Sequence, residues 1–461
     1  MSENVFSKSD WASEYESELK LVDALWGGTK AMRENLEYLP TNTKEHKDDY
    51  ANRVSKTFLT NFFKKTIYGH AGRIFEDEVI VKDDAKMEEF AQNVDYEGRD
   101  IHRFAYSLAT KTMRDGIRFI LIDAPKAEGV KTRADEIAQG IRPYWIEIDR
   151  RQVLGFKSKG NVLTLVRILE SVEEDADEFT TKIIEQVRVL EPYRVRIYRK
   201  NEKNEVFLYD EFETTMPDIG LIPVYAMQDS FMQSEPPLMD IAYLNIEHWQ
   251  KSSDQSNILH YARVPIMHYA GYDASLNDDG TEKEFVIGAG SMVKNRNPSA
   301  KLEYVEHSGA AIGAGRQDLV DIEDRAHALG ADFAVNKTGD IKATVRVLNE
   351  AGANSKLCAF AINLQDSLEL ALEYTARLFG GEFSGSVYVN RDFGISENQL
   401  TVETLLKMRV SQEIDRETFW NLFNEITGKE ISGSEVGERL EDEGLGFTLP
   451  EMQEENADIN G

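Results

Sequence analysis

Two helical segments flank a short β-rich insert in the second half of the chain, and this order restricts the possible folds. Apolar residues recur at helical spacing from Leu238 to about Ala262, whereas short strands and Gly, Asn and Asp turns follow from Arg263 to Val305. A second helical pattern starts after Ser308. An insert of about 45 residues is too long for an ordinary connection between helices. We therefore expect a small β element between two helices.

A longer helical pattern follows, from Ala343 to Phe379. Gly352 is expected to kink or interrupt this helix, and the glycine pair after Phe379 to end it. The string VYVNRDF then predicts a short strand, and residues 402–426 predict a pair of helices. The last thirty or so residues are rich in Glu, Asp and Gly, which is typical of a loosely ordered acidic tail.

Helical spacing also dominates the beginning of the chain, from about residue 9 to residue 74. One predicted stripe runs from Tyr50 through Phe58 to Phe62. Residues 99–114 predict a further amphipathic helix, after which the pattern changes to that of strands.

Between Ile117 and Tyr225 the chain is a succession of short runs rich in β-branched and aromatic residues. Charged and apolar residues partly alternate, as from Arg194 to Ile197, which predicts antiparallel strands with one face in water. Together with the N-terminal helices, these runs predict an α+β region of about two hundred residues, within the size of one domain.

The charge balance limits the partners that the chain can bind. It has 82 acidic and 53 basic side chains, so its formal net charge is 53 − 82 = −29. Tight, nonspecific binding to duplex nucleic acid is not expected, because phosphate neutralisation needs a basic surface. An acidic protein could still let nucleic acid pass without holding it.

The single cysteine, Cys358, excludes an intrachain disulfide, and its thiol is expected in the core. The N-terminus lacks the basic and apolar regions of a signal peptide. No stretch reaches the roughly eighteen apolar residues of a membrane span. We therefore expect a soluble, unexported protein that makes no contact with a membrane.

The motifs of common catalytic sites are missing from the sequence. The glycine-rich run from Gly309 to Gln317 lacks the Lys and hydroxyl of a phosphate-binding loop, and Asp318 stands where a dinucleotide-binding pattern needs glycine. His248, His260 and His268 form a loose cluster without metal-ligand spacing. No GxSxG elbow occurs. These observations predict a non-enzyme without cofactor or metal, and the abundant paired carboxylates leave a metal-dependent nuclease as an alternative.

Several local strings, taken in their order along the chain, resemble one protein family. They are EYLP (37–40), the segment with Tyr50, Arg53, Phe58 and Asn61, GRIF (72–75), RPYW (142–145), NVLTLVRILE, QVRVL, IPVYAM and PPLMDIAYLNIEHWQKSSDQSNILHYARVP. With these strings and with the order of helices and strands, the chain resembles the portal proteins of tailed bacteriophages over almost its whole length.

The resemblance implies a portal-protein fold, which is an α+β fold with a wing, stem helices, a β-rich clip, a long tunnel/wing helix and a helical crown. It implies these ranges: wing 1–237, first stem helix 238–262, clip 263–308, second stem helix 309–331, tunnel loop 332–342, long helix returning to the wing 343–380, and crown with acidic tail 381–461.

The resemblance also implies a function. Portal proteins form a dodecameric ring at one capsid vertex, and its axial channel serves genome packaging and ejection. The implied partners are the other copies of a twelve-subunit ring, the large terminase, the major capsid and scaffolding proteins, head-completion and tail adaptor proteins, and double-stranded DNA in the channel. The implied location is the portal vertex of the virion, and the host cytoplasm during assembly. The alternative is another structural virion protein, such as a head-completion or minor capsid protein.

Three basic residues lie in or next to the implied tunnel loop, namely Lys337, Lys342 and Arg346. A sparse ring of such cations could touch the backbone of passing DNA. Alternatively, they are ordinary solvated side chains, since their spacing is loose.

Overall fold

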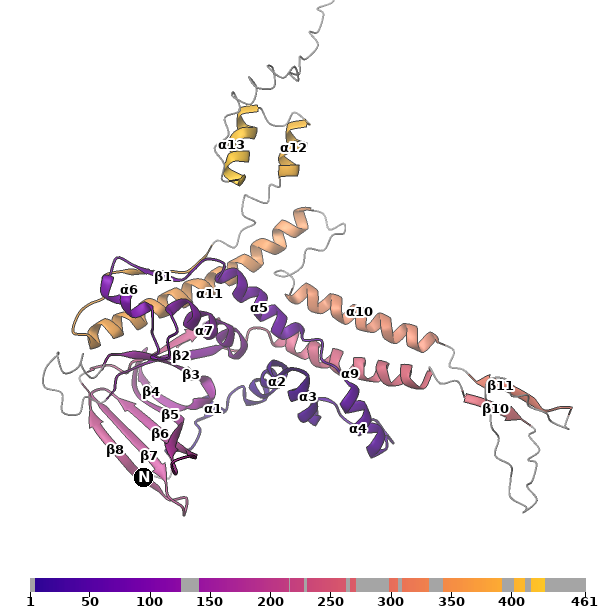
Figure 1. The fold of residues 1–461 in the computed structure, drawn as a ribbon, viewed down its shortest axis with the longest axis horizontal. Helices are drawn as coiled ribbons and strands as arrows, with labels where there is room; N and C mark the ends of the chain where they lie inside the picture. Colours follow the sequence, from indigo (N-terminus) through magenta and orange to yellow (C-terminus); the bar gives the residue numbers. More distant parts are fainter. Residues whose placement is uncertain are drawn as a thin grey trace, which may run out of the picture. The chain divides into compact units, whose positions relative to one another are not determined.

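The computed structural model divides the chain into two units, Met1–Arg391 and Asp392–Gly461 (Figure 1). The described residues form a mixed α and β structure, in agreement with the predicted α+β class. In the long helix α11 (Ala343–Leu378), side chains are described from residue 356 onward. The structure describes residues 5–125, 141–214, 216–227, 230–262, 266–270, 298–305, 309–330, 343–391, 402–410 and 416–427.

Short helices form the N-terminal part of the first unit. Side chains cap several of them, because the first backbone N–H groups of a helix lack partners within it. Asn61 accepts a hydrogen bond from the Lys64 amide at 2.9 Å, and Asp100 accepts one from the Arg103 amide at 2.7 Å. The helices are α1 (Asp10–Ser13), α2 (Glu16–Trp26), α3 (Gly28–Glu34), η1 (Leu36–Tyr38), α4 (Lys47–Lys56), α5 (Phe62–Ile74), α6 (Ala85–Ala91) and α7 (Ile101–Asp115).

The predicted stripe from Tyr50 to Phe62 is wrong in its middle. Helix α4 ends before Thr57, whose carbonyl accepts hydrogen bonds from the Arg33 guanidinium at 2.9 and 3.0 Å. Phe58 therefore lies in a connection between two helices and is 67% exposed, whereas Phe62 is buried at the start of α5. The periodicity of α4 cannot show that Arg33, a side chain of another helix, binds the backbone where α4 ends.

Two antiparallel sheets follow in the first unit, as the alternation of residues predicts. The three-stranded sheet has the order β3-β2-β9, and the five-stranded sheet is a meander in the order β4-β5-β6-β7-β8. The strands are β2 (Ile117–Asp123), β3 (Tyr144–Asp149), β4 (Val153–Lys159), β5 (Val162–Asp175), β6 (Thr181–Glu191), β7 (Arg194–Lys200), β8 (Val206–Glu213) and β9 (Leu221–Tyr225).

A buried core lies where the two sheets meet. Phe119 and Leu121 of β2 share one buried cluster with Val166 and Ile168 of β5. Helices α7 and α11 also pack against β2. This strand is therefore buried almost throughout, unlike the half-wet strands that the sequence predicts. Cys358 of α11 is only partly buried, so the prediction of a core thiol is wrong.

The predicted helix, β insert and second helix are confirmed, and their bounds are close to those expected. Strands β10 and β11 pair antiparallel, from Ile266 opposite Val305 to Ala270 opposite Lys301. Helix α11 continues through Gly352 without interruption. Residues 271–297 of the predicted insert lie outside the described residues. The elements are α9 (Met239–Ala262), β10 (Ile266–Ala270), β11 (Lys301–Val305) and α10 (Ala310–Gly330), and β1 (Ile80–Lys82) pairs with β12 (Ser386–Tyr388) after α11.

The described part of the second unit is a pair of helices, α12 (Val402–Val410) and α13 (Arg416–Thr427). They contact each other, and Leu405 and Phe419 are buried. These helices match the pair predicted over residues 402–426. The predicted acidic tail lies outside the described residues.

Candidate functional site

The three predicted DNA contacts fall largely outside the described residues. Lys337 and Lys342 are not among them, and Arg346 lies in the part of α11 whose side chains are not described. Their role stays a prediction. The described elements nearest to them in the chain are α10 and the rest of α11, and α9 packs against α10. The candidate site described below lies on these helices.

Helices α9 and α10 lie side by side and run antiparallel (Figure 1). Near the start of α10, the Gln255 amide donates a hydrogen bond to the Ile312 carbonyl at 2.9 Å. Further along, His248 Nε2 lies 3.2 Å from Glu323 Oε1. Residue numbers thus fall along α9 while they rise along α10, so the second helix returns along the first.

An exposed ionic cluster on these two helices sets their register. Lys251 Nζ lies 2.7 Å from Glu247 of its own helix and 2.9 Å from Asp318 of α10. Hydrogen bonds to both carboxylates raise the pKa of Lys251. Arg325 approaches Glu247 at 3.6 Å. Because these side chains are well exposed, each pair adds little stability, and the cluster mainly favours one alignment of the helices.

A small residue lets the two helices approach closely. A Cβ atom on Gly315 would overlap the Gln255 side-chain amide. Without that Cβ, Gln255 can reach the backbone of α10. Gly315, in the glycine-rich run that could not be assigned to a nucleotide site from the sequence, thus serves helix packing, whereas Gly313 of the same run has no neighbour within 4 Å of the position that a Cβ atom would take.

Most described side chains of α10 are not buried. Among them, Ile322 and Ala326 are the buried ones, whereas Val320 is 39% and Leu329 is 51% exposed. On α9, Tyr243 is 55% exposed. Helices in proteins are stabilised mostly by packing of an apolar face, and the described side chains of α10 have little such packing. The helix pair therefore presents a surface that a further element can cover.

The first half of α9 is held firmly by the N-terminal helices. Asn245 is fully buried, and its side-chain oxygen accepts a hydrogen bond from the Phe63 amide at 3.1 Å. Its side-chain nitrogen donates to the Thr60 carbonyl at 2.8 Å. Trp249 is also fully buried. This helix is thus anchored at one end, while β10 follows its other end.

Arg53 joins three of the strings that carry the family resemblance. Its guanidinium donates to Glu45 at 2.7 and 2.8 Å, to the Pro40 carbonyl at 2.9 Å and to Ser253 Oγ of α9 at 3.4 Å. The hydrogen bond from Arg53 lowers the pKa of Glu45 despite burial. These strings therefore share a structural role, since their residues meet at the junction between the N-terminal helices and α9.

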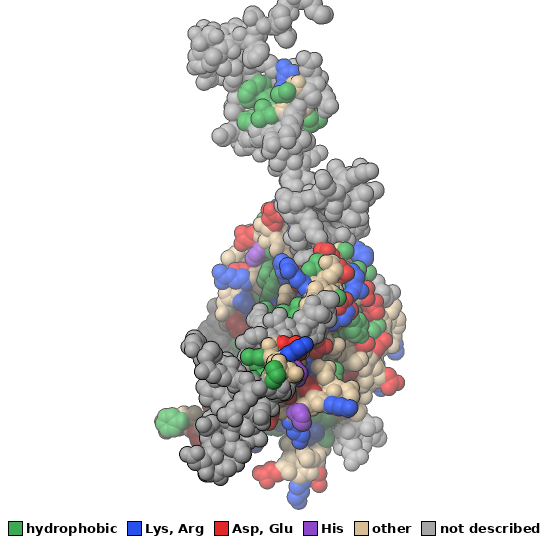
Figure 2. Space-filling model, turned by 90° about the vertical axis from the view of Figure 1, so that its right-hand side faces the viewer, with side chains coloured by type: hydrophobic (Ala, Val, Ile, Leu, Met, Phe, Trp, Pro, Cys, Tyr) green, Lys and Arg blue, Asp and Glu red, His purple; other side chains and the backbone are tan. Residues whose placement is uncertain are grey.

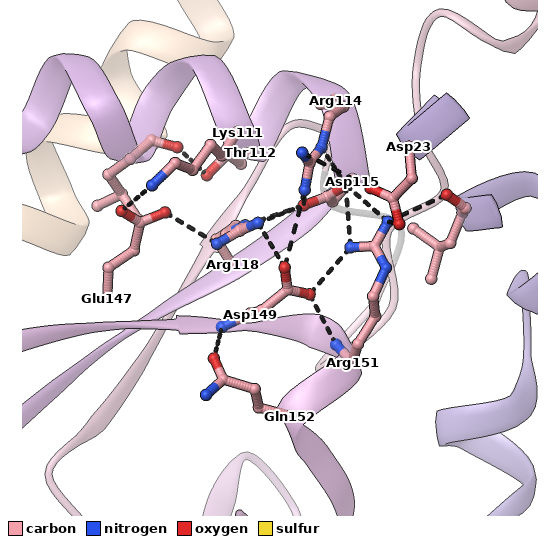
Figure 3. A network of polar contacts seen from close by, with 12 residues as sticks. Asp23, Lys111, Thr112, Arg114, Asp115, Arg118, Glu147, Asp149, Arg151 and Gln152 are labelled. Atoms are coloured by element: carbon pink, nitrogen blue, oxygen red, sulfur yellow. Dashed lines mark hydrogen bonds and ion pairs between the residues drawn. The ribbon is translucent and has the colours of Figure 1, made fainter. Parts of the chain in front are cut away.

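A second polar constellation is an ionic network where α2, α7 and the three-stranded sheet meet (Figure 3). Arg118 of β2 lies 2.9 Å from Glu147 and 2.6 Å from Asp149, both of β3. Arg151, in the short helix η2 (Arg150–Gln152), lies 2.9 Å from Asp23 of α2. The members are the cations Lys111, Arg114, Arg118 and Arg151 and the anions Asp23, Asp115, Glu147 and Asp149, so their formal charges cancel.

Asp115 lies at the centre of this network and has no exposed surface. Its carboxylate accepts hydrogen bonds from Arg114 at 2.7 Å twice, from Arg118 at 2.9 Å and from Arg151 at 3.3 Å. Burial alone would raise the pKa of Asp115, but the hydrogen bonds and charges of these arginines outweigh it and lower the pKa. The group thus stays ionised, and the network fixes helices to sheet.

The sequence predictions missed this network, although a signal for it exists. Apart from Asp23, its residues lie in the strings KTMRDGIRF and WIEIDRR, which predict only a helix end and two strands. Charged residues inside runs that are otherwise apolar are seldom buried unless they are paired. Arg118, between Ile117 and Phe119, is such a residue.

No metal site or membrane helix is found in the described part of the chain. There, no group of three or more His, Cys, Asp or Glu side chains could hold a metal ion. The histidines of the predicted loose cluster do not form one group, since His248 pairs with Glu323 of α10 and His268 with Glu303 of β11. Over the same residues, no helix combines the length and apolarity needed to cross a membrane.

One family model matches part of the chain, and several solved structures are loosely similar to most of it. The family described as "Domain of unknown function (DUF4055)" matches residues 237–378, which hold α9, β10, β11, α10 and α11. No curated protein matches the chain. Among solved structures, a chain titled "Neck of empty GTA particle computed with C6 symmetry" is 11% identical, with 83% of this chain and 90% of that chain covered and a TM-score of 0.38.

Two further structures are similar to the same degree. One is titled "Virion of native gene transfer agent (GTA) particle", at 11% identity, 78% and 88% coverage and a TM-score of 0.37. The other is titled "Neck of native GTA particle computed with C12 symmetry", at 10% identity with the same coverage and TM-score. TM-scores this low mark a loose likeness, and no activity or partner follows from it for the present chain.

Proposed function

We propose that this chain is a portal protein of a tailed bacteriophage, which assembles into a ring of about twelve copies around a channel for DNA. One observation carries the proposal: in the helix pair α9 and α10, joined through the β10–β11 element, most described side chains of α10 are not buried. A neighbouring copy at this face would supply the packing that α10 lacks.

The strings that suggested the family support the proposal independently of this face. Arg53 and Ser253 belong to two different strings and are hydrogen-bonded to each other. Strings that act together at one junction are better support than strings scattered over unrelated surfaces. The proposed regions keep the ranges given above, from the wing at 1–237 to the crown and tail at 381–461.

The charge of the chain suits a conduit for DNA. With a net charge of −29, a ring of many copies would repel phosphate and keep contacts with the duplex weak. On the face in Figure 2, basic and acidic side chains of the described residues are interleaved. Passage of DNA through the ring would then meet little resistance from binding.

Lys337, Lys342 and Arg346 are the proposed points of contact with DNA in the channel. Replacing all three with alanine should leave the mass of the ring unchanged and weaken the salt-dependent binding of duplex DNA to it. Binding with an unchanged salt dependence would show that these residues are ordinary solvated cations.

The proposed clip can be tested by deleting residues 263–306. We expect a protein that still folds, since α9 is anchored through Asn245 and Trp249, but that forms no stable ring and does not bind the large terminase. Circular dichroism and a thermal melt would verify the fold. Terminase binding equal to that of the full chain would contradict the assignment of this segment.

A further inference from the structure

Residues 5–14, the N-terminal arm, lie against the five-stranded sheet without a buried side chain of their own. Each side chain of the arm is half-buried or exposed. Its one helix, α1, has four residues, and a helix this short is not stable by itself in water. The arm therefore depends on its contacts with the sheet for its conformation.

Hydrogen bonds fix the arm to the sheet and to the segment before α9. They run from the Arg167 guanidinium to the Val5 and Ser7 carbonyls at 2.9 and 2.8 Å, from the Ser9 amide to the Leu154 carbonyl at 2.8 Å, and from Trp11 Nε1 to the Met232 carbonyl at 2.7 Å. The groups of the arm in these bonds belong to residues that are not buried. Such a segment opens at a lower free energy than a packed core does.

The arm covers an apolar cluster that is separate from the core between the sheets. Val187 and Val189 of β6 are buried in this cluster, and Val5 and Phe6 of the arm pack on it. Leu190, the next residue of β6, belongs instead to the cluster between the two sheets. Because successive side chains of a strand point to opposite faces, the arm is a cover on the outer face of the sheet.

One unfavourable feature of the closed arm is a buried charge. Arg150 is 1% exposed, and its Nη1 donates to the Ser234 carbonyl at 2.9 Å. Its Nε and Nη2 find no hydrogen-bond acceptor among the described residues, although the Glu14 carboxylate lies 3.9 Å from Nη2. The rings of Trp11 and Tyr15 lie 5.1 and 4.8 Å from the guanidinium carbon.

A buried cation without a full set of hydrogen bonds is costly, and the two rings replace only part of its hydration. Burial accordingly lowers the pKa of Arg150. Glu14 and Trp11 belong to the arm, and Tyr15 follows it directly. Opening of the arm would therefore let water reach the guanidinium.

A second unfavourable feature lies at the junction between the arm and α2. Tyr15 has φ +61° and ψ +19°, the left-handed conformation. A bulky side chain is strained there, because its Cβ atom approaches the backbone. Helix α2, which follows, is fixed by buried residues such as Val22 and Leu25. The strain thus lies at the point where a mobile arm would meet a fixed helix.

We propose that the N-terminal arm opens as one piece about Tyr15 while both sheets stay folded. The closed state gains the packing of Phe6 and Trp11, whereas the open state hydrates Arg150 and relaxes Tyr15. Each state thus has favourable terms of its own, as a two-state element requires. Opening bares the apolar cluster at Val187, so the closed arm keeps this face from contact with other molecules. The proposal does not depend on the ring.

The rate at which buried cysteines react tests the opening. In a chain with Cys358→Ser, Val187→Cys places a thiol beneath the arm. The matched control is Val166→Cys, in the neighbouring strand β5, which is equally buried but faces the cluster between the sheets. Cysteine is readily buried, so both variants should fold, and circular dichroism would verify this.

The two variants are treated in native buffer with an aromatic disulfide reagent whose reaction is followed by absorbance. We expect Val187→Cys to react at least about a hundredfold faster than Val166→Cys, at a rate that low urea concentrations leave unchanged. Equal rates would show that the thiol is reached only by global unfolding and would overturn the proposal.

A second variant tests whether the arm moves as one piece. Trp11 is not part of the cluster around Val187, yet adding Trp11→Ala to the Val187→Cys chain should speed its reaction at least about tenfold. Phe58→Ala, which removes an exposed aromatic side chain outside the arm, should leave the rate unchanged. A rate that Trp11→Ala does not change, or that Phe58→Ala raises equally, would overturn the opening as one piece.

Discussion

Replacing Asp115 with asparagine should strongly destabilise the first unit. The carboxylate is fully buried and accepts hydrogen bonds from Arg114, Arg118 and Arg151. The amide keeps one acceptor oxygen but turns an N–H group toward guanidinium groups, and the charge of the network changes from zero to +1. Removing one partner of a buried ionic network costs about 3–5 kcal/mol, so we expect a loss of this size.

The assay is urea denaturation of the two proteins, followed by tryptophan fluorescence. At pH 7 the Asp115→Asn variant should unfold at lower urea with an unchanged slope. The pKa of Asp115 is below its ordinary value of 3.8, so its contribution is present above that pH and is lost as the pH falls through the lower, folded-state value. The difference between the two proteins should therefore shrink in strong acid.

The matched control is Glu202→Gln, which also removes one carboxylate charge but at an exposed turn. It should change the free energy of unfolding by less than about 0.5 kcal/mol. A loss below about 1 kcal/mol for Asp115→Asn would show that the arginines find other partners, and it would refute the structural role assigned to the network.

Two further predictions concern single residues of the first unit. Burial, with a smaller effect from Arg73, lowers the pKa of His70 from 6.5 to about 4, so the free energy of unfolding of the wild type should fall by roughly 1–3 kcal/mol between pH 6.5 and pH 4. In urea titrations at several pH values, the His70→Gln variant should show a weaker dependence on pH. An equal dependence in both proteins would contradict the role of His70. Gly116 has φ +86°, and a Cβ there would lie 2.6 Å from the Glu235 backbone. Gly116→Ala should therefore lower the free energy of unfolding by about 2 kcal/mol or more in the same denaturation assay. An unchanged free energy of unfolding would show that the backbone at Glu235 can move to accommodate the methyl group.

The sequence predicts the order of the elements well, because that order depends on local periodicity. The helix at 238–262 is confirmed as α9, and the strand runs between Ile117 and Tyr225 are confirmed as antiparallel strands. What periodicity does not contain is contact between distant segments. The exposure of Phe58 and the pairing of β2 with β9 both depend on such contacts.

The candidate site is less predictable than the fold for the same reason. Gly315 near the start of α10 is visible in the sequence, but its use depends on Gln255 of another helix. The Asp115 network joins residues of five elements, α2, α7, β2, β3 and η2, and only the apolar context of Arg118 indicates that this arginine is buried. Lys337 and Lys342 lie outside the described residues, so their predicted role rests on the family resemblance.

The mass and symmetry of the purified protein test the central proposal most directly. Light scattering and class averages of single-particle images should show a ring with a central hole, at about twelve times the chain mass of 52.4 kDa. A compact dimer, or a monomer that stays monomeric when co-expressed with its capsid scaffold, would contradict the proposed ring.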